Sequence, residues 1–428
     1  SNSMVELYLI LRYLRPNKLK ELGLNTFDAW ASIFAKRSSE IEYTVTGELK
    51  IRERFREFVN VPEMAMLYAA IADVRNEKNL KLPKPSLNFN LIDIEPSKTQ
   101  KWYMKEIISF VQNGYSTTLH LSGDNVKKAK GLLSSTLSAK VSMDPRLLDA
   151  NNLDEDSSKV HQSAINIARI YHETEEYKGV QLVFSDIGTP STGEFNVYDE
   201  LKRKLTEEHG IPRDTIAYIH DASTDLSRLQ LYDKVRSGII RVLIGSSQKL
   251  GTGTNVQDRV IAIHQLDIPW TPTLFQQRNG RGGRQGNWLA PKICNNSVPV
   301  YLYALKQSLD TYKYQLIQIK DNFINQVRDG SIKERTFDEG ADGENSMPLA
   351  EFIAILSGNP LILEKANVDK EIKKLYTSQR IFEEEGFYRK QKIANLKVRI
   401  EQIQEETNNA EKDIKHFIAN GFGKLEDG

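Results

Sequence analysis

Short apolar runs alternate with segments of helical period between residues 179 and 305. Most of these runs are apolar at every position, which is typical of strands buried on both faces. Strands are predicted at 180–185, 215–221, 240–245, 259–266 and 298–304, and the helices between them include 198–209, 224–237 and 273–284. This alternation predicts right-handed βαβ units, and therefore an α/β domain over 159–330 with a parallel sheet and helices on both faces.

The chain before this domain has a helical pattern. Helices are predicted at 7–14, 26–36 and 63–77, with a polar turn at 44–48 and a proline-rich stretch at 82–85 that cannot continue a helix. We therefore expect residues 1–95 to form a helical arm. Residues 96–158 are expected to hold connecting helices and, from residue 124, a surface linker, because Gly, Ser, Asp and Asn are frequent there.

The last part of the chain, 331–428, has an apolar seam with alternating spacings of three and four residues, which is typical of a coiled coil. The seam consists of Ile372, Leu375, Phe382, Ile393, Leu396, Ile400, Ile403, Ala410, Ile414 and Phe417. Gln379, Gly386 and Arg389 occupy seam positions midway. The pattern therefore fits one continuous helix and two helices folded back on each other equally well.

Charge and cysteine content exclude several classes of site. Lys and Arg total 58 and Asp and Glu total 57, so any surface that attracts nucleic acid must be a local patch. Cys294 is the only cysteine and the seven histidines are scattered, so we expect no disulfide and no metal bound by Cys or His. No apolar run approaches the length of about 20 residues that a membrane span needs, and no secretory signal pattern is present. We therefore expect a cytoplasmic protein.

The run QQRNGRGGRQGN, residues 276–287, combines three arginines at a spacing of three with four glycines. If the run is helical, Arg278, Arg281 and Arg284 fall on one face. Glycine inside a helix costs about 0.5–1 kcal/mol relative to alanine, so an ordinary solvated helix leaves the glycines unexplained. A forked guanidinium suits a phosphate, and glycine permits close approach. The run therefore predicts contact with a phosphorylated ligand.

Two further loops are predicted at the same edge of the sheet. The segment RVLIGSSQKLGTGTN, residues 241–255, runs from a buried strand into a polar loop with two glycines, and HQLDIPWTP follows at 264–272. Either loop alone fits an ordinary turn. Because ligands of parallel sheets bind beyond the carboxyl ends of the strands, the succession of these loops and the arginine run favours one shared site.

The order VQLVFSD, IGSSQKLGTGTNVQ, LDIPWTP and QQRNGRGGRQGN resembles motifs IV, V and VI of superfamily 2 helicases of the Swi/Snf type. The run from GTGTNVQ to GGRQGN is most similar to helicase and DNA-methylase proteins of conjugative plasmids and transposons. FDAWASIFA and IRERFREFVNVPEMAMLY resemble an insertion between the two helicase lobes of that family. The resemblance implies a bacterial protein whose 159–330 segment is the second RecA-like lobe.

Residue roles follow from the resemblance at the matching positions. In the motif Q-x-x-G-R-x-x-R, the matches are Gln277, Gly280, Arg281 and Arg284. The resemblance implies that Arg281 and Arg284 are arginine fingers, which reach the ATP γ-phosphate across the lobe interface and stabilise charge that develops in phosphoryl transfer.

The resemblance also implies contacts in motif V and along the nucleic acid. Gly251, Gly253 and Asn255 match the motif V residues that couple the nucleotide site to the nucleic acid. The residues expected to contact the nucleic acid are Ser185, Ser246, Ser247, Lys249 and Arg278. Lys249 and Leu250 stand where the simpler Swi/Snf pattern has small residues. For Arg278, a second interpretation is a solvent-facing partner of an acidic side chain.

The chain has no G-x-x-x-x-G-K-[ST] sequence, so it has no P-loop of its own to hold ATP and Mg²⁺. The pair Asp199-Glu200 is interpreted as helix N-terminal acid and not as a metal-binding DE box. The first residues, SNSMVELY, resemble the segment after motif III, and the NPLI sequence at 359–362 departs from the N-P-P-Y methylase motif. We therefore expect ATP and Mg²⁺ to bind only in an intact protein that also holds the first lobe.

Two hypotheses of function stay open from the sequence. In the first, the chain is the second motor lobe of an ATP-dependent DNA helicase or translocase, part of a larger helicase-methylase of a mobile element; its partners are DNA, the first lobe and, in the larger protein, a methyltransferase domain. In the second, it is a non-hydrolysing module that binds nucleic acid while the tail recruits a partner helix. A P-loop in the same polypeptide favours the first, and a tail that associates favours the second.

Overall fold

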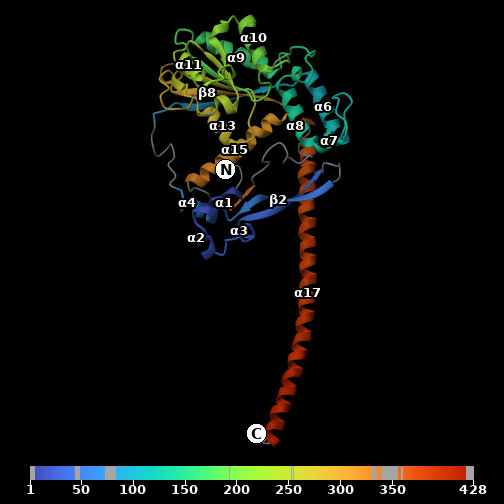
Figure 1. The fold of residues 1–428 in the computed structure, drawn as a ribbon. Coiled ribbons are helices and arrows are strands. Elements are labelled where there is room, and N and C mark those ends of the chain that lie inside the picture. Colours follow the sequence, from blue (N-terminus) through green and yellow to red (C-terminus); the bar gives the residue numbers. More distant parts are fainter. Residues whose placement is uncertain are drawn as a thin grey trace. The chain divides into compact units, whose positions relative to one another are not determined.

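The computed structural model describes residues 5–43, 49–72, 83–191, 193–251, 253, 255–329, 335–338, 355–357 and 360–420. The turn expected at 44–48 lies outside these residues. The chain divides into two compact units, Ser1–Glu364 and Lys365–Gly428. The first unit contains the predicted sheet and the arm, and the second consists of the tail (Figure 1).

A parallel sheet forms the core of the first unit, with strand order β3-β8-β7-β4-β6-β5. Its strands are β3 (Ser86–Ile94), β4 (Val180–Phe184), β5 (Ile216–Tyr218), β6 (Val242–Gly245), β7 (Val260–Gln265) and β8 (Ser297–Leu305), and all neighbours pair in parallel. The five predicted strands are thus confirmed. β3 lies within the segment 1–95 that was expected to be a helical arm, but it is an edge strand of this sheet and pairs with β8 from Ser86 to Ile94.

Helices cover both faces of the sheet, as predicted (Figure 1). One face packs against α6 (Lys98–Asn113), α8 (Lys130–Met143), α9 (Lys159–Glu173) and α10 (Val197–Arg203). The other packs against α11 (Asp225–Arg236), α12 (Ser247–Leu250), α13 (Pro272–Asn279), α14 (Ala290–Ile293) and α15 (Leu309–Asp329). Successive residues of β4 alternate between the two cores, since Val183 joins the first core and Leu182 and Phe184 join the second.

The surface linker predicted from residue 124 is wrong for much of its length. After the short helix α7 (Asp124–Lys128), helix α8 buries Ser134, Ser138, Val141 and Met143 almost completely. Small side chains allow a helix to lie close to its neighbours, so a serine-rich segment serves here as a core helix. The composition that suggested a linker therefore reflects close packing of α8 against the first core.

The arm contains a sheet as well as helices, so the purely helical arm is wrong. Its helices are α1 (Val5–Leu14), α2 (Pro16–Glu21), α3 (Phe27–Phe34) and α4 (Val61–Ala69), and its antiparallel strands are β1 (Ala35–Tyr43), β2 (Leu49–Val59) and β9 (Thr336–Asp338) in the order β1-β2-β9. Trp30, Phe34 and Phe58 are buried in the arm's own core, which also contains Phe323 and Phe337.

The tail is one continuous helix, α17 (Pro360–Asn420), so the structure selects one of the two arrangements that the seam allowed. Its described seam residues are exposed, among them Ile393, Leu396, Ile400 and Ile403. No helix in the described residues is both long enough and apolar enough to cross a membrane.

Candidate functional site

Three loops follow neighbouring strands at the carboxyl edge of the sheet. Ser185 and Asp186 follow β4, Ser247 opens α12 directly after β6, and Asp267 lies just after β7. The strand order places β7, β4 and β6 side by side, so these loops meet at one edge. The two loops that the sequence predicted at one edge, after β6 and β7, therefore do meet, and the loop after β4 joins them.

Arg278 of α13 is the centre of this edge and is completely buried. Its Nε donates to the Ser247 hydroxyl at 2.6 Å, and its Nη1 donates to the Gln265 side-chain oxygen at 3.2 Å and the Asp267 carbonyl at 2.7 Å. Its Nη2 donates to carboxylate oxygens of Asp186 at 2.6 Å and Asp267 at 2.8 Å. A guanidinium has five N–H groups, so this side chain uses all of its donors.

The two carboxylates extend the network into the loop backbones. Asp267 Oδ2 accepts from the backbone N–H groups of Asp186 at 2.5 Å and Ile187 at 2.9 Å. Asp186 accepts from the Ser247 N–H at 2.6 Å and hydroxyl at 2.7 Å. Burial alone raises the pKa of Asp186, but the charge of Arg278 and the hydrogen bonds from Ser247 outweigh it, so the pKa lies below its ordinary value. One buried cation thus fixes the loops after β4, β6 and β7 to α13.

Three predicted nucleic-acid contacts are corrected by this geometry. Arg278 and Ser185 have no exposed surface and Ser247 has 4%. Ser185 donates to the carbonyl of Ile187 at 2.7 Å, and Ser247 is engaged by Arg278 and Asp186. These side chains are too buried for a nucleic-acid strand to contact them. The second interpretation of Arg278, a solvent-facing partner of an acidic side chain, is also wrong, because its acidic partners lie inside the fold. The other two predicted contacts differ: Ser246 caps α12 and is partly exposed, and Lys249 is exposed.

Arg281 and Arg284 lie beyond the end of α13, which stops at Asn279. The helix predicted over 273–284 is therefore too long, and the three arginines do not share a helical face. Arg281 is 6% exposed and its Nε donates to the carbonyl of Gly251 at 2.9 Å, whereas Arg284 is exposed. Burial and then the positive charge of Arg284 lower the pKa of Arg281. The loop after α13 thus carries two arginines close enough to repel, one anchored and one open to solvent.

The glycines of the run allow the loop to lie on the sheet. A Cβ on Gly282 would come within 2.8 Å of Ile263 in β7, and one on Gly283 would come within 3.1 Å of Leu87 in β3. Close approach was predicted, and the nearest neighbours are strand side chains. Gly280 caps α13, Gln277 is half-buried, and Gly253 and Asn255 are exposed, Gly253 with a φ of 71°.

A pocket of about 370 Å³ lies beside the Arg278 network. It is lined partly by Asp186, Asp267 and the loop that carries Trp270, with Lys140 and Lys313 contributing cationic groups. The Lys313 ammonium lies 4.4 Å from the centre of the Trp270 ring. An indole beside two lysines offers a stacking face and positive charge, which are the groups that bind single nucleotides along a strand.

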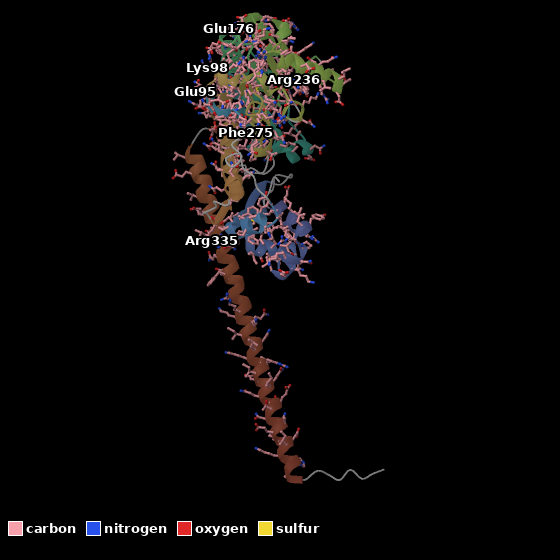
Figure 2. All side chains as sticks on the ribbon, turned by 90° about the vertical axis from the view of Figure 1, so that its left-hand side faces the viewer. Glu95, Lys98, Glu176, Arg236, Phe275 and Arg335 are labelled. Carbon is pink, nitrogen blue, oxygen red and sulfur yellow. The ribbon has the colours of Figure 1, made fainter. Side chains whose placement is uncertain are left out.

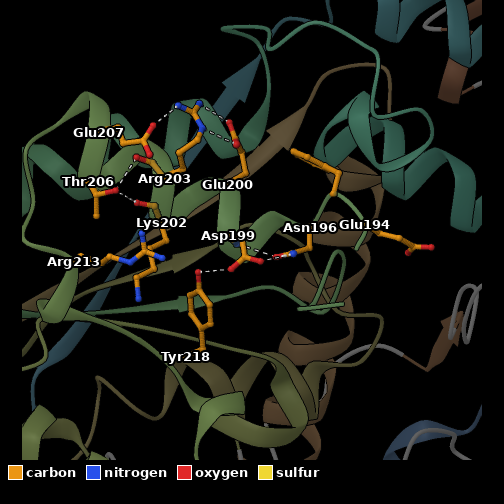
Figure 3. Close-up of a pocket in the computed structure, with 11 residues that line it drawn as sticks. Glu194, Asn196, Asp199, Glu200, Lys202, Arg203, Thr206, Glu207, Arg213 and Tyr218 are labelled. Atoms are coloured by element: carbon orange, nitrogen blue, oxygen red, sulfur yellow. Dashed lines mark hydrogen bonds and ion pairs between the residues drawn. The ribbon is translucent and has the colours of Figure 1, made fainter. Parts of the chain in front are cut away.

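A second hollow, of about 330 Å³, surrounds the start of α10 (Figure 3). Asn196 caps this helix by accepting from the Asp199 N–H at 2.9 Å, and Tyr218 donates to the Asp199 carboxylate at 3.0 Å. Glu200 is paired with Arg203 at 2.8 Å and Arg146 at 3.0 Å. Asp199 and Glu200 therefore act as helix N-terminal acid, which confirms the sequence interpretation.

Sequence reasoning missed Asp186, Asp267, Gln265 and Asn279, which surround the arginine run. Gln265 donates to Asn279 at 2.5 Å, in addition to accepting from Arg278. A usable signal existed, because two buried apolar strands end in FSD and QLD, and an aspartate at the carboxyl end of a buried strand requires a partner.

Comparisons with known families agree with this geometry. Residues 166–286 match the model of the helicase conserved C-terminal domain, and residues 1–76 match that of a probable helicase domain. A segment of 128 residues is 30% identical to Defense against restriction protein B of Escherichia phage P1, covering 30% of this chain and 5% of that protein. The chain thus spans a small part of that relative's length.

Solved structures with similar folds include C-terminal ATPase domains. The C-terminal part of the Fun30 ATPase domain has a TM-score of 0.39 at 16% identity, over 57% of this chain and 98% of that one. The SWI2/SNF2 ATPase C-terminal domain of Sulfolobus solfataricus has a TM-score of 0.36 at 14% identity, over 57% and 93%. The Hef helicase domain of Pyrococcus furiosus has a TM-score of 0.37 at 14% identity, over 59% and 62%.

Proposed function

We propose that the helicase C-terminal domain formed by residues 166–286 is the second motor lobe of an ATP-dependent DNA helicase or translocase. The observation that supports the proposal is the pair Arg281 and Arg284 in the loop that follows α13. Arg281 is held by the carbonyl of Gly251, and Arg284 is open to solvent. A nucleotide bound to a P-loop lobe of the same protein would receive positive charge from this pair when the two lobes close.

The link between Arg281 and Gly251 supports a coupling role. Gly251 directly follows α12, whose first residue, Ser247, is held by Arg278 and Asp186. The hydrogen bond from Arg281 to the Gly251 carbonyl therefore links the proposed nucleotide contact directly to the segment that carries Ser246 and Lys249. We assign DNA-backbone contact to Ser246 and Lys249, because these two of the five expected residues are accessible.

ATP hydrolysis in a polypeptide that joins this chain to a P-loop lobe tests the arginine pair. Arg284→Ala should lower DNA-stimulated turnover by on the order of 10³, since an arginine finger contributes about that much or more. Arg213→Ala is the matched control, because Arg213 is exposed and precedes β5, at the opposite edge of the sheet. Undiminished turnover in both Arg281→Ala and Arg284→Ala would contradict the assignment.

DNA binding by this chain tests the second part. The logarithm of affinity should fall linearly with that of salt concentration, and Lys249→Ala should reduce the slope by about 1, as expected when one phosphate contact is lost. An unchanged slope in Lys249→Ala would remove that residue from the interface.

We further propose that the protein comes from a bacterial mobile element and works in the cytoplasm. The likeness to a phage P1 protein supports the mobile-element origin. A methyltransferase domain in the same polypeptide stays a prediction, and sequencing the complete gene tests it together with the P-loop.

A further inference from the structure

The tail helix has an apolar seam that no described part of its own unit covers. Every side chain from residue 389 to residue 416 is exposed, and side chains project all around the helix (Figure 2). Ile393, Leu396, Ile400 and Ile403 are between 47% and 56% exposed. An apolar stripe on an otherwise charged helix is stable in water when another helix packs against it.

The residues beside the seam have a charge order that is specific to one pairing. With Ile393 and Ile400 at position a of the heptad and Leu396 and Ile403 at position d, the g positions are Lys392, Arg399, Glu406 and Asp413, and the e positions are Lys390, Lys397, Gln404 and Glu411. Basic residues thus precede the centre of the segment and acidic residues follow it. In coiled coils, e and g residues determine which partner and which orientation is favoured.

An antiparallel pair of identical segments, centred between Glu401 and Gln402, gives every one of these charges except Lys397 an opposite charge to face, and Lys397 faces the neutral Gln404. Arg399 then faces Glu406 of the second copy, Lys392 faces its Asp413, and Lys390 faces its Glu411. Each contact occurs twice because the pair has twofold symmetry.

The same register also fills the seam. Its central layers place Ile400 against Ile403 of the second copy, and the next layers place Leu396 against Thr407 and Ile393 against Ala410. Thr407 donates its hydroxyl to the carbonyl of Ile403 at 2.7 Å, so its only donor is satisfied within the helix.

The parallel arrangement opposes like charges. Residue g then faces residue e of the following heptad, so that Lys392 meets Lys397 and Glu406 meets Glu411, while Arg399 meets the neutral Gln404. Basic residues before the segment centre match acidic residues at equal distances after it. This match brings opposite charges together when two identical segments pair in the antiparallel orientation, and it gives no such contacts in a parallel pair.

We propose that residues 389–416 bind the same segment of a second copy of this chain as an antiparallel coiled coil. This dimerisation is independent of the motor function proposed above. It joins two motor lobes through tails that run in opposite directions, over a pairing region about 42 Å long at ~1.5 Å per residue.

The mass of the 428-residue chain in solution, and the effect of charge-reversing substitutions on its dimerisation, test the pairing. Sedimentation equilibrium should give a dimer of twice the 48.8 kDa chain mass. The double variant Lys392→Glu, Arg399→Glu should weaken the dimer by about tenfold or more, because four attractive pairs become repulsive. Its mixture with Glu406→Lys, Asp413→Lys should restore a heterodimer.

A matched control makes the same change in charge elsewhere on the helix. Lys397→Glu, Lys412→Glu should leave the dimer unchanged, since Lys397 faces Gln404 and Lys412 is on the outer face. In a parallel dimer the control would strengthen association by relieving the contact between Lys392 and Lys397. A strengthened control, or a monomeric wild-type chain throughout the concentration series, would overturn the proposal.

Cysteine pairing tests the orientation, in a Cys294→Ser background. Ala410→Cys chains mixed with Ile393→Cys chains should form a disulfide between the two variants, because these positions share a layer. Ala410→Cys alone should not cross-link, since its two copies would lie about 26 Å apart at ~1.5 Å per residue. Efficient cross-linking of Ala410→Cys with itself indicates a parallel pair and contradicts the proposal.

Discussion

The carboxyl edge of the sheet buries a charged side chain, whereas the tail helix exposes apolar ones. At the edge, a charged side chain is completely buried, and Arg278 meets five acceptors at 2.6–3.2 Å. On the tail, isoleucines and a leucine are about half exposed. A buried charge is tolerated when every donor is paired, and an exposed apolar seam is stable when another surface covers it. The network at the edge is complete within one chain, whereas the seam of the tail is exposed, and we propose a second copy of the chain as its partner.

The largest expected effect comes from breaking the buried network. Arg278→Ala should lower the free energy of unfolding of the sheet domain by about 3–5 kcal/mol, because it leaves Asp186 and Asp267 without their cation. Urea denaturation measures the change. Arg284→Ala, at an exposed position of the same run, should change it by less than about 0.5 kcal/mol. Equal effects of the two variants would show that burial does not distinguish these arginines.

Acidification should destabilise the sheet domain through His264, the next largest effect. This side chain is completely buried beside Gln181 and Tyr303, and burial lowers its pKa from 6.5 to about 3. Below pH 6.5 the unfolded chain binds a proton that the folded chain does not, so stability falls as pH falls toward 3. The loss between pH 6.5 and pH 4.5 is about 2 kcal/mol.

Denaturation curves across this pH range measure the slope. His264→Gln should remove its share, so that the difference in unfolding free energy between variant and wild type shrinks with acidification. A constant difference would show that His264 has the same pKa in both states.

Filling the space between the arginine loop and the sheet should have an effect of similar size. Gly282→Ala is expected to cost about 1–3 kcal/mol, because the added Cβ would lie 2.8 Å from Ile263 in a packed core. Gly131→Ala in α8 is the control, since nothing lies within 4 Å of its added Cβ and alanine favours a helix. Thermal unfolding compares them, and a Gly282→Ala variant as stable as wild type would mean that the loop can lift from the sheet.

The smallest expected effect on the sheet domain comes from the tail. Leu396→Ser should change its unfolding free energy by less than about 0.5 kcal/mol, since the side chain is 52% exposed and belongs to the other unit. The same variant should weaken the proposed dimer. A large loss of sheet stability in Leu396→Ser would show that the stabilities of the two units are coupled, and would contradict the view that the sheet domain is complete without the tail.

Much of the sheet could be predicted because its central strands are apolar on both faces, and β4, β6 and β7 lie where the pattern placed them. The edge strand β3 was missed since it has one neighbouring strand, and polar side chains such as Asn88 and Asn90 interrupt its apolar positions. The hairpin of β1 and β2 was missed because charged residues are frequent in both strands. Buried elements therefore have a clearer hydrophobic pattern in the sequence than exposed ones.

The candidate site was predicted in position more than in role. Motif order placed Arg278 at the carboxyl edge, where it contacts the ends of β4, β6 and β7, but spacing alone gave Arg278, Arg281 and Arg284 equivalent surroundings. Their differences arise from tertiary contacts: α13 ends at Asn279, Asp186 and Asp267 enclose Arg278, and Arg281 lies under the Gly251 carbonyl. Such contacts join residues up to 92 positions apart, which no local pattern contains.

The five bonds of Arg278 have a mechanical consequence. They tie α13 to the ends of β4, β6 and β7, so that pulling on any one of these loops transmits force to the remaining ones through a single planar group. Independent flexing of each loop would break charge-assisted bonds without replacement by water. We therefore expect these loops to move together rather than one at a time.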